Sequence, residues 1–140
     1  MRHIMVATDG SDGANRAIDI AAELAKGEGR TLSIVAVARP LSAEERQLFE
    51  RIEATDPAEV LAQRNLYEAV QRVREAGIAA AKTCLVRGEP AEAIIKTIER
   101  EKVDAIVVGR RGRGQLAGLL LGSVSQKLCS LAPCVVIVAP

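Results

Sequence analysis

The sequence predicts an α/β fold, in which a doubly wound, five-stranded parallel sheet of Rossmann-like type carries helices on both faces. Apolar runs rich in valine and isoleucine alternate along the chain with stretches whose apolar residues recur at helical spacing. Aromatic residues make up 1% of the chain, so the core must be built from Ala, Val, Ile and Leu, as in buried parallel strands. At 140 residues, the chain is long enough for one such core, and we expect a single domain over residues 1–140.

The first two predicted strands flank an amphipathic helix. Residues 4–8 form a short apolar run that breaks into the turn DGSDG. Between residues 14 and 25 the apolar positions line one helix face, and Gly27 and Gly29 end that helix. The run TLSIVAVA, residues 31–38, predicts the second strand.

The segment between Arg39 and Asp56 is polar and irregular, and its role stays open. We expect a short helix over residues 43–51 within it. Pro57 then opens a longer helix that runs to about residue 76, because proline fits the first turn of a helix.

Two further strands and a helix follow. An apolar run predicts the third strand over residues 78–86, and Pro90 after the turn GEP opens the next helix. Residues 103–108 are almost wholly apolar, which is typical of a strand that is buried on both faces.

The last helix and strand close the alternation. Ser123 is expected to cap a helix that ends at Pro133 and whose inward residues are Val124, Leu128 and Leu131. The terminal strand is expected to begin at Cys134 and to end at Ala139. As the last strand it is expected at a sheet edge, where an unpaired apolar ladder invites pairing with a second chain.

This topology predicts where a ligand binds. Strands that alternate with helices form a parallel sheet with right-handed crossovers, and ligands bind beyond the carboxyl ends of the strands where the strand order reverses. If the first and fourth strands are neighbours there, the turn at Asp9 and the loop after Gly109 face one crevice.

The loop after the fourth strand has the spacing G-x2-G-x9-G-S, with glycines at 109, 112 and 122. It is not a P-loop, because Gln115 and Leu116 stand where Lys and Ser/Thr are needed, and a dinucleotide motif over residues 112–117 lacks the acidic residue that should follow. Glycines at 109 and 112 are expected to let the backbone approach a ligand and to adopt positive φ, while Gly122 and Ser123 present free amides and a hydroxyl at a helix start. A polyphosphate suits such a loop.

Arginines at positions 110, 111 and 113 raise the alternative of a nucleic-acid patch. A net charge of +1 and the lack of aromatic stacking partners argue against nucleic acid, and the uncharged stretch 115–126 is shorter than the roughly 20 residues that span a bilayer. We therefore expect neither a nucleic-acid nor a membrane partner. The chain begins directly in a strand pattern without a signal peptide, so we expect a cytoplasmic protein.

The ATDGS turn, the VRGEP turn and the segment GRRGRGQLAGLLLGSVS resemble the universal stress proteins, and specifically their nucleotide-binding branch with the motif G-x2-G-x9-G-[ST]. The resemblance covers the whole chain. It implies an ATP-binding domain of the universal stress protein type that acts in stress adaptation. It also implies a homodimer formed through the terminal strand from Cys134 to Ala139, and it is compatible with a Mg²⁺ ion held mainly by the phosphates.

The resemblance also implies roles for individual positions. Those expected at the adenosine end are Ala7, Thr8 and Asp9, and those expected to flank the base or ribose are Val37 and Val108. Those expected on the ribose and phosphates are Gly109, Arg111, Gly112, Gly122, Ser123, Val124 and Ser125. Ala7 departs from the family, whose members often carry proline there. Arg111 stands where His or another polar residue is frequent, and its side chain is expected to pair with phosphate.

Fast catalysis is not expected. Neither His nor Asp/Glu lies within the loop as a general base, and a P-loop lysine is missing, so the sequence favours a nucleotide-binding protein over an efficient ATPase. Three alternatives stay open: a slow ATP hydrolase, a protein that binds AMP or a cyclic nucleotide, and a dimeric interaction module that needs no nucleotide.

Overall fold

Five parallel strands form one sheet in the computed structural model, which describes residues 1–49, 56–112 and 120–140. The strand order is β3-β2-β1-β4-β5, and every neighbouring pair is parallel. The strands are β1 (His3–Ala7), β2 (Thr31–Ala38), β3 (Lys82–Arg87), β4 (Ala105–Gly109) and β5 (Val135–Ala139). The predicted α/β fold with a doubly wound parallel sheet is confirmed, and β5 lies at an edge as expected.

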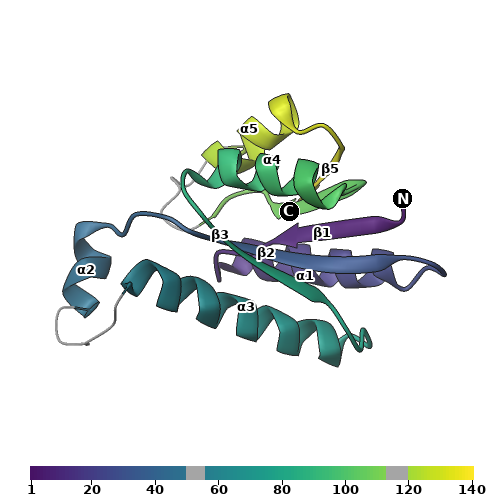
Figure 1. The fold of residues 1–140 in the computed structure, drawn as a ribbon, viewed down its shortest axis with the longest axis horizontal. Coiled ribbons are helices and arrows are strands. Elements are labelled where there is room, and N and C mark those ends of the chain that lie inside the picture. Colours follow the sequence, from purple (N-terminus) through teal and green to yellow (C-terminus); the bar gives the residue numbers. More distant parts are fainter. Residues whose placement is uncertain (50–55, 113–119) are drawn as a thin grey trace.

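Helices cover both faces of this sheet (Figure 1). On one face lie α1 (Asp12–Ala25) and α3 (Pro57–Glu75), and on the other lie α4 (Pro90–Glu101) and α5 (Ser123–Leu131). The short helix α2 (Ala43–Phe49) projects beyond the carboxyl ends of the strands. Within the described ranges, no helix has both the length and the apolar character needed to cross a bilayer.

Two hydrophobic cores lie on opposite faces of the sheet because side chains alternate along each strand. Val6 points to the core that contains Ile18 of α1. Its neighbour Met5 points to the second core, with Ile98 of α4 and Leu128 of α5. No aromatic side chain is among the described members of either core, in accord with the near absence of aromatic residues from the sequence.

The pairing of β1 with β4 places the carboxyl ends of these two strands side by side. Ile4 aligns with Ala105 and Val6 with Val107, so the two strands are in register up to the turns that follow them. The strand order reverses at this pair, because β2 lies on the other side of β1 and β5 on the other side of β4. The predicted juxtaposition of the turn after β1 with the loop after β4 is therefore confirmed.

The third strand begins later than the apolar pattern indicates. It starts at Lys82, whereas the sequence predicted a strand from residue 78. The amide of Ile78 instead donates to the carbonyl of Val73 at 3.1 Å, so this residue completes the end of α3, and its side chain packs against the first core. An apolar run reports burial but does not distinguish strand pairing from other ways of being buried.

Two expectations for the last helix are wrong. Gly122, not Ser123, is the N-cap, because Ser123 already has helical geometry as the first residue of α5. Leu131 is 65% exposed rather than inward-facing, since Ala132 after it packs against the core in its place. The end of the predicted helix over residues 43–51 lies outside the described residues, beyond Phe49.

Replacing Leu128 by alanine is expected to lower the free energy of unfolding by about 2–5 kcal/mol, because this fully buried side chain fills the second core. Leu131→Ala is the matched control in the same helix and is expected to change stability by less than about 0.5 kcal/mol, because the side chain is exposed. Chemical denaturation followed by circular dichroism measures both, and equal effects would contradict the assignment of the buried face.

Candidate functional site

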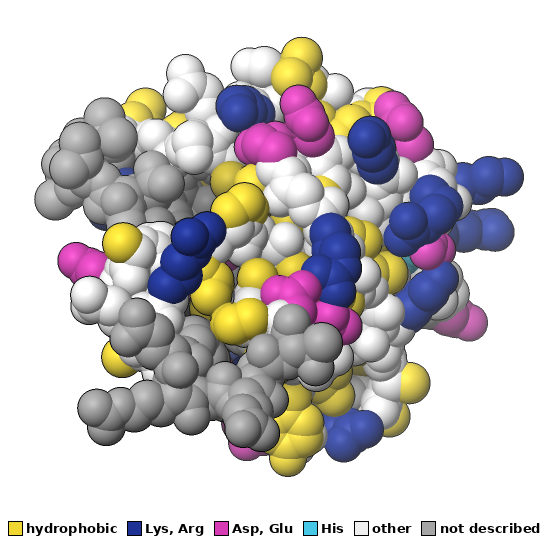
Figure 2. All heavy atoms as spheres, turned by 60° about the vertical axis from the view of Figure 1, so that its left-hand side comes forward, with side chains coloured by type: hydrophobic (Ala, Val, Ile, Leu, Met, Phe, Trp, Pro, Cys, Tyr) yellow, Lys and Arg dark blue, Asp and Glu magenta, His cyan; other side chains and the backbone are white. Residues whose placement is uncertain are grey.

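A crevice of about 840 Å³ opens at the carboxyl ends of the strands. Figure 2 looks at this end of the molecule, where hydrophobic side chains line a hollow with charged side chains at its margin. The ends of β1, β2 and β4, the first turn of α5 and the start of α2 form its walls. Its volume falls within the range of pockets that hold small organic ligands.

Every position predicted from the sequence lines this crevice. From β1 and its turn come Ala7, Thr8 and Asp9, and from β2 comes Val37. From β4 and the loop after it come Val108, Gly109, Arg111 and Gly112, and from the start of α5 come Gly122, Ser123, Val124 and Ser125. The structure therefore brings the predicted residues together around one space, and their contact with a ligand stays a prediction.

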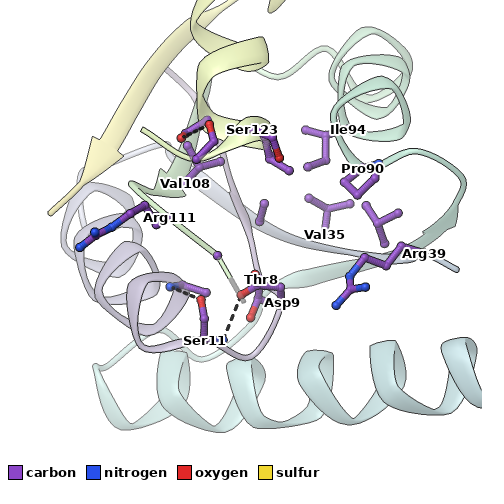
Figure 3. Close-up of a pocket in the computed structure, with 18 of the residues that line it drawn as sticks. Thr8, Asp9, Ser11, Val35, Arg39, Pro90, Ile94, Val108, Arg111 and Ser123 are labelled. Carbon is purple, nitrogen blue, oxygen red and sulfur yellow. Dashed lines mark hydrogen bonds between the residues drawn. The ribbon is translucent and has the colours of Figure 1, made fainter. Parts of the chain in front are cut away.

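The interior wall of the crevice is aliphatic. Val35 and Val37 of β2, Val108 of β4 and Ile94 of α4 line it (Figure 3). None of the lining residues that the structure describes is Phe, Tyr or Trp. A flat ligand in this space must therefore pack against branched aliphatic side chains.

The turn after β1 holds a carboxylate at the crevice. Thr8 donates its amide to the carbonyl of Val35 at 2.9 Å, which continues the pairing of β1 with β2. Asp9 Oδ1 then accepts the amide of Ser11 at 3.0 Å, and Ser11 Oγ accepts the amide of Ala14 at 3.1 Å as the N-cap of α1. Asp9 is thus a turn residue, as Asp after a strand often is, and it also lines the crevice.

Gly109 is required by packing between backbone segments. A Cβ at this position would lie 2.7 Å from the carbonyl carbon of Gly13, and a Cβ at Gly13 would lie 2.7 Å from the carbonyl oxygen of Arg111. The first turn of α1 therefore rests directly on the end of β4. The expectation that Gly109 and Gly112 adopt positive φ is wrong, since neither is among the residues with that conformation.

Gly112 has a different neighbour. A Cβ at this position would meet Oδ2 of Asp9. The missing side chain therefore lets the loop after β4 lie against the carboxylate of the turn after β1, across the reversal of strand order. The middle of this loop, which includes Arg113 and the alternative motif over residues 112–117, lies largely outside the described residues.

Two polar groups at the start of α5 bind within the protein. The amide of Gly122 donates to the carbonyl of Arg110 at 2.7 Å, so the expectation that this amide is free is wrong. The buried hydroxyl of Ser125 lies 2.7 Å from the same carbonyl and 3.1 Å from the carbonyl of Gly122, and it donates within this pair. These hydrogen bonds join the loop after β4 to the start of α5. Because the Ser125 hydroxyl proton is already donated within the protein, Ser125 has only its main-chain amide as a donor for a ligand.

The next amides of α5 point out of the helix start. The first intrahelical bond runs from the amide of Gln126 to the carbonyl of Gly122 at 3.0 Å, so the amides of Ser123, Val124 and Ser125 precede it. Aligned peptide dipoles give this end of a helix a partial positive charge. Anions bind at such ends.

The other helices cover their own first turns with side chains. The N-cap side chains of α1, α3 and α4 are Ser11, Asp56 and Glu89, and Ser42 accepts the amide of Glu45 in α2. The N-cap of α5 is glycine, which has no side chain for this purpose. Among the described helices that line the crevice, α5 is therefore the one that leaves its first amides to an external acceptor.

Sequence reasoning missed one wall of the crevice, which comes from the segment whose role it left open. Arg39, Ser42, Glu44 and Glu45 line the crevice beside α2. The signal was present in the sequence as a capping box, S-x-x-E. Ser42 Oγ accepts the amide of Glu45 at 3.2 Å, and Glu45 Oε1 accepts the amide of Ser42 at 3.1 Å. The Ser42 amide and the nearby Arg39 guanidinium lower the pKa of Glu45, which keeps this side chain ionised.

The two arginines in the described part of the lining point in different directions (Figure 3). The guanidinium of Arg111 is directed away from the other labelled residues, whereas that of Arg39 is directed toward Thr8 and Asp9. The expected pairing of the Arg111 side chain with phosphate would need a different side-chain conformation. In this structure Arg111 contributes to the crevice by its position in the loop.

Comparison with known proteins identifies relatives over the full length of the chain. The family model described as "Universal stress protein family" matches residues 1–140. The universal stress protein in the QAH/OAS sulfhydrylase 3′ region of Thermus aquaticus is 36% identical over 140 residues, which cover 96% of this chain and 95% of that relative.

Two similar solved structures contain adenine nucleotides. One is a universal stress protein in complex with cAMP, with a TM-score of 0.73, 27% identity and coverage of 99% of this chain and 97% of that chain. The other is the universal stress protein from Archaeoglobus fulgidus in complex with dAMP, with a TM-score of 0.72, 25% identity and coverage of 100% of this chain and 98% of that chain.

Gly109→Ala is expected to destabilise the protein by about 1–3 kcal/mol, because the added Cβ meets the backbone of Gly13 and must push α1 away from β4. Gly112→Ala is expected to cost less, since the atom that the new Cβ meets is the end of the Asp9 side chain. Urea denaturation of both variants compares the two costs. A stability of Gly109→Ala equal to that of the unmodified protein would contradict the packing role of Gly109.

Proposed function

Because the chain belongs to the universal stress protein family, we propose that its crevice binds ATP and that the occupied state regulates a stress response in the cytoplasm. The observation that carries this proposal is the uncapped start of α5, which lines the same crevice as Asp9. The crevice thus offers main-chain donors to an anion beside an aliphatic wall for a base. The cAMP and dAMP complexes of related proteins support an adenine nucleotide as the ligand.

Charge determines the proposed orientation of the nucleotide. Phosphates are repelled by the carboxylate of Asp9 and attracted by the first amides of α5, so the phosphate end lies near Ser123 and Val124. The adenosine end then lies near Asp9 and Val37, against the aliphatic wall. Each hydrogen bond from an amide to a charged phosphate contributes roughly 1.5–3 kcal/mol.

A Mg²⁺ ion in this site would depend on the nucleotide. Among residues 1–49, 56–112 and 120–140, no group of three or more His, Cys, Asp or Glu side chains is placed to hold a metal. Phosphate oxygens and water would therefore supply most of its ligands, as is common for Mg²⁺.

A second candidate ligand is AMP or a cyclic nucleotide. The solved complexes of related proteins contain cAMP and dAMP, each of which has one phosphate group. A single phosphate group can accept hydrogen bonds from the first amides of α5, just as one phosphate of a triphosphate can. The order of affinities for ATP, AMP and cAMP separates this candidate from the first.

Isothermal titration is expected to show that the protein binds ATP and that Ser123→Pro weakens binding by about 10- to 100-fold. Proline is favourable as the first residue of a helix, so α5 keeps its start while losing one amide donor. The extended backbone of Gly122 is compatible with a following proline.

Ser123→Ala is the matched control, because it removes the hydroxyl and keeps the amide. Ser123→Ala is expected to bind ATP more tightly than Ser123→Pro, and the ratio of the two dissociation constants gives the contribution of the Ser123 amide to binding. Absence of binding to ATP, AMP and cAMP at millimolar concentration would overturn the proposed function.

We also propose that two chains associate through the edge strand β5. Its outer edge carries no neighbouring strand in the described sheet, and Val135 is 52% exposed. An exposed apolar edge pairs readily with a second copy. Cys134, which was expected to begin this strand, lies just before it.

Val135→Lys is expected to weaken dimerisation by at least tenfold, because two like charges would meet near the shared edge. The side chain is exposed, so the single chain is expected to keep its fold. Tyr67→Lys is the control, because Tyr67 is also exposed but lies on α3. Sedimentation velocity over a concentration series measures both variants, and an unmodified protein that stays monomeric would contradict the proposal.

A further inference from the structure

We propose that Arg39 is a base-binding residue, which closes the nucleobase end of the crevice with its guanidinium and packs against the face of the purine. This inference rests on the proposed function, since it names how that same site recognises its ligand. It concerns a residue that the motif after β4 does not include.

The position of Arg39 follows from the geometry of β2. This strand ends at Ala38, and side chains two residues apart in an extended chain face the same side. Val35 and Val37 line the crevice, and Arg39 continues their row one step beyond the strand. The arginine stem therefore extends the aliphatic wall toward solvent, at the end of the crevice where Thr8 and Asp9 lie (Figure 3).

The guanidinium is held in place by the start of α2. Arg39 Nη1 lies 3.3 Å from Glu45 Oε1 and 3.4 Å from the carbonyl of Pro40. Glu45 is itself fixed by the amide of Ser42 in the capping box. The contacts from Ser42 to Glu45 and from Glu45 to Arg39 thus limit the motion of the Arg39 side chain. This side chain therefore loses less conformational entropy when a ligand binds.

The remaining surface of the guanidinium suits a base. Both side-chain hydrogen bonds of Arg39 within the described structure are donated by Nη1, and an arginine has further donors on Nε and Nη2. Its planar face packs on aromatic rings, and the attraction increases when the cation is partly shielded from water. The Arg39 side chain is 37% exposed and that of Glu45 is 20% exposed, so the pair is partly shielded.

The amino-acid composition of the crevice lining favours a contact between Arg39 and the base. Its described lining lacks aromatic side chains, so one face of a purine would meet valine and isoleucine, and the planar guanidinium of Arg39 suits the other face. Of the two cations in the described lining, Arg39 turns its side chain toward Thr8 and Asp9 in Figure 3, whereas Arg111 turns away. The phosphate donors of α5 lie on another wall, so a contact from Arg39 falls on the base.

Titration of AMP, ADP and ATP into the unmodified protein and Arg39→Ala tests the assignment. A base contact is expected to weaken all three by the same factor, about 5- to 30-fold, because the base is common to them. Arg39→Lys is expected to recover little of this loss, since lysine keeps the charge but lacks the planar group. Arg46→Ala, which removes an exposed arginine of α2 outside the crevice, is expected to stay within twofold.

The role of Glu45 has its own test. Glu45→Gln keeps an acceptor for the Ser42 amide and removes the charge that holds Arg39. It is expected to weaken AMP binding by about two- to fivefold in the unmodified protein and to have no effect when Arg39 is already alanine. An equal loss in both backgrounds would overturn the positioning role. Thermal unfolding of every variant confirms that the fold is kept.

The possible results of these titrations distinguish a failure of the inference from a failure of the proposed function. Binding by the unmodified protein with Arg39→Ala within twofold would overturn the inference and leave the nucleotide site intact. A loss that grows from AMP to ATP would overturn the base contact in favour of a phosphate contact. Absence of binding by the unmodified protein would overturn both the inference and the proposed function.

Discussion

The parallel pairing of β1 with β4, together with the close approach of α1 to β4, is the constraint on which the site depends. Pairing brings the two carboxyl ends into register, and the strand order reverses between them. Gly13 and Gly109 then allow the first turn of α1 to rest on the end of β4 with backbone against backbone. Any side chain between them would move the turn that carries Asp9 relative to the loop that leads to α5.

This arrangement produces a crevice with separated charges. A carboxylate lies at the turn after β1, and the uncapped amides of a helix start lie on another wall. The aliphatic side chains of β2, β4 and α4 lie between them. A ligand that matches such a surface has an apolar, hydrogen-bonding body and an anionic end, and this combination is what a nucleotide offers.

The glycines of the loop illustrate why a motif does not reveal the role of each member. Gly109 serves packing against α1, Gly112 makes room for the carboxylate of Asp9, and Gly122 closes the loop through its bond to Arg110. All three line the crevice, yet each also has a neighbour within the protein. Their spacing therefore reflects the construction of the loop as much as the approach of a ligand.

Hydrophobic periodicity and turn residues are local properties, and they were sufficient to predict the alternation of strands and helices and the edge position of the last strand. The individual residues around the crevice were predicted from the resemblance to the universal stress proteins. It did not reveal that Ile78 belongs to the end of α3 or that Leu131 is exposed, since both depend on which neighbour occupies the adjacent space. Only the tertiary structure placed Arg39 over the crevice. That placement arises from the end of β2 and the capping box of α2 acting together. Both lie within residues 38–45, but the sequence of this segment does not show that it lines a crevice with the ends of β1 and β4.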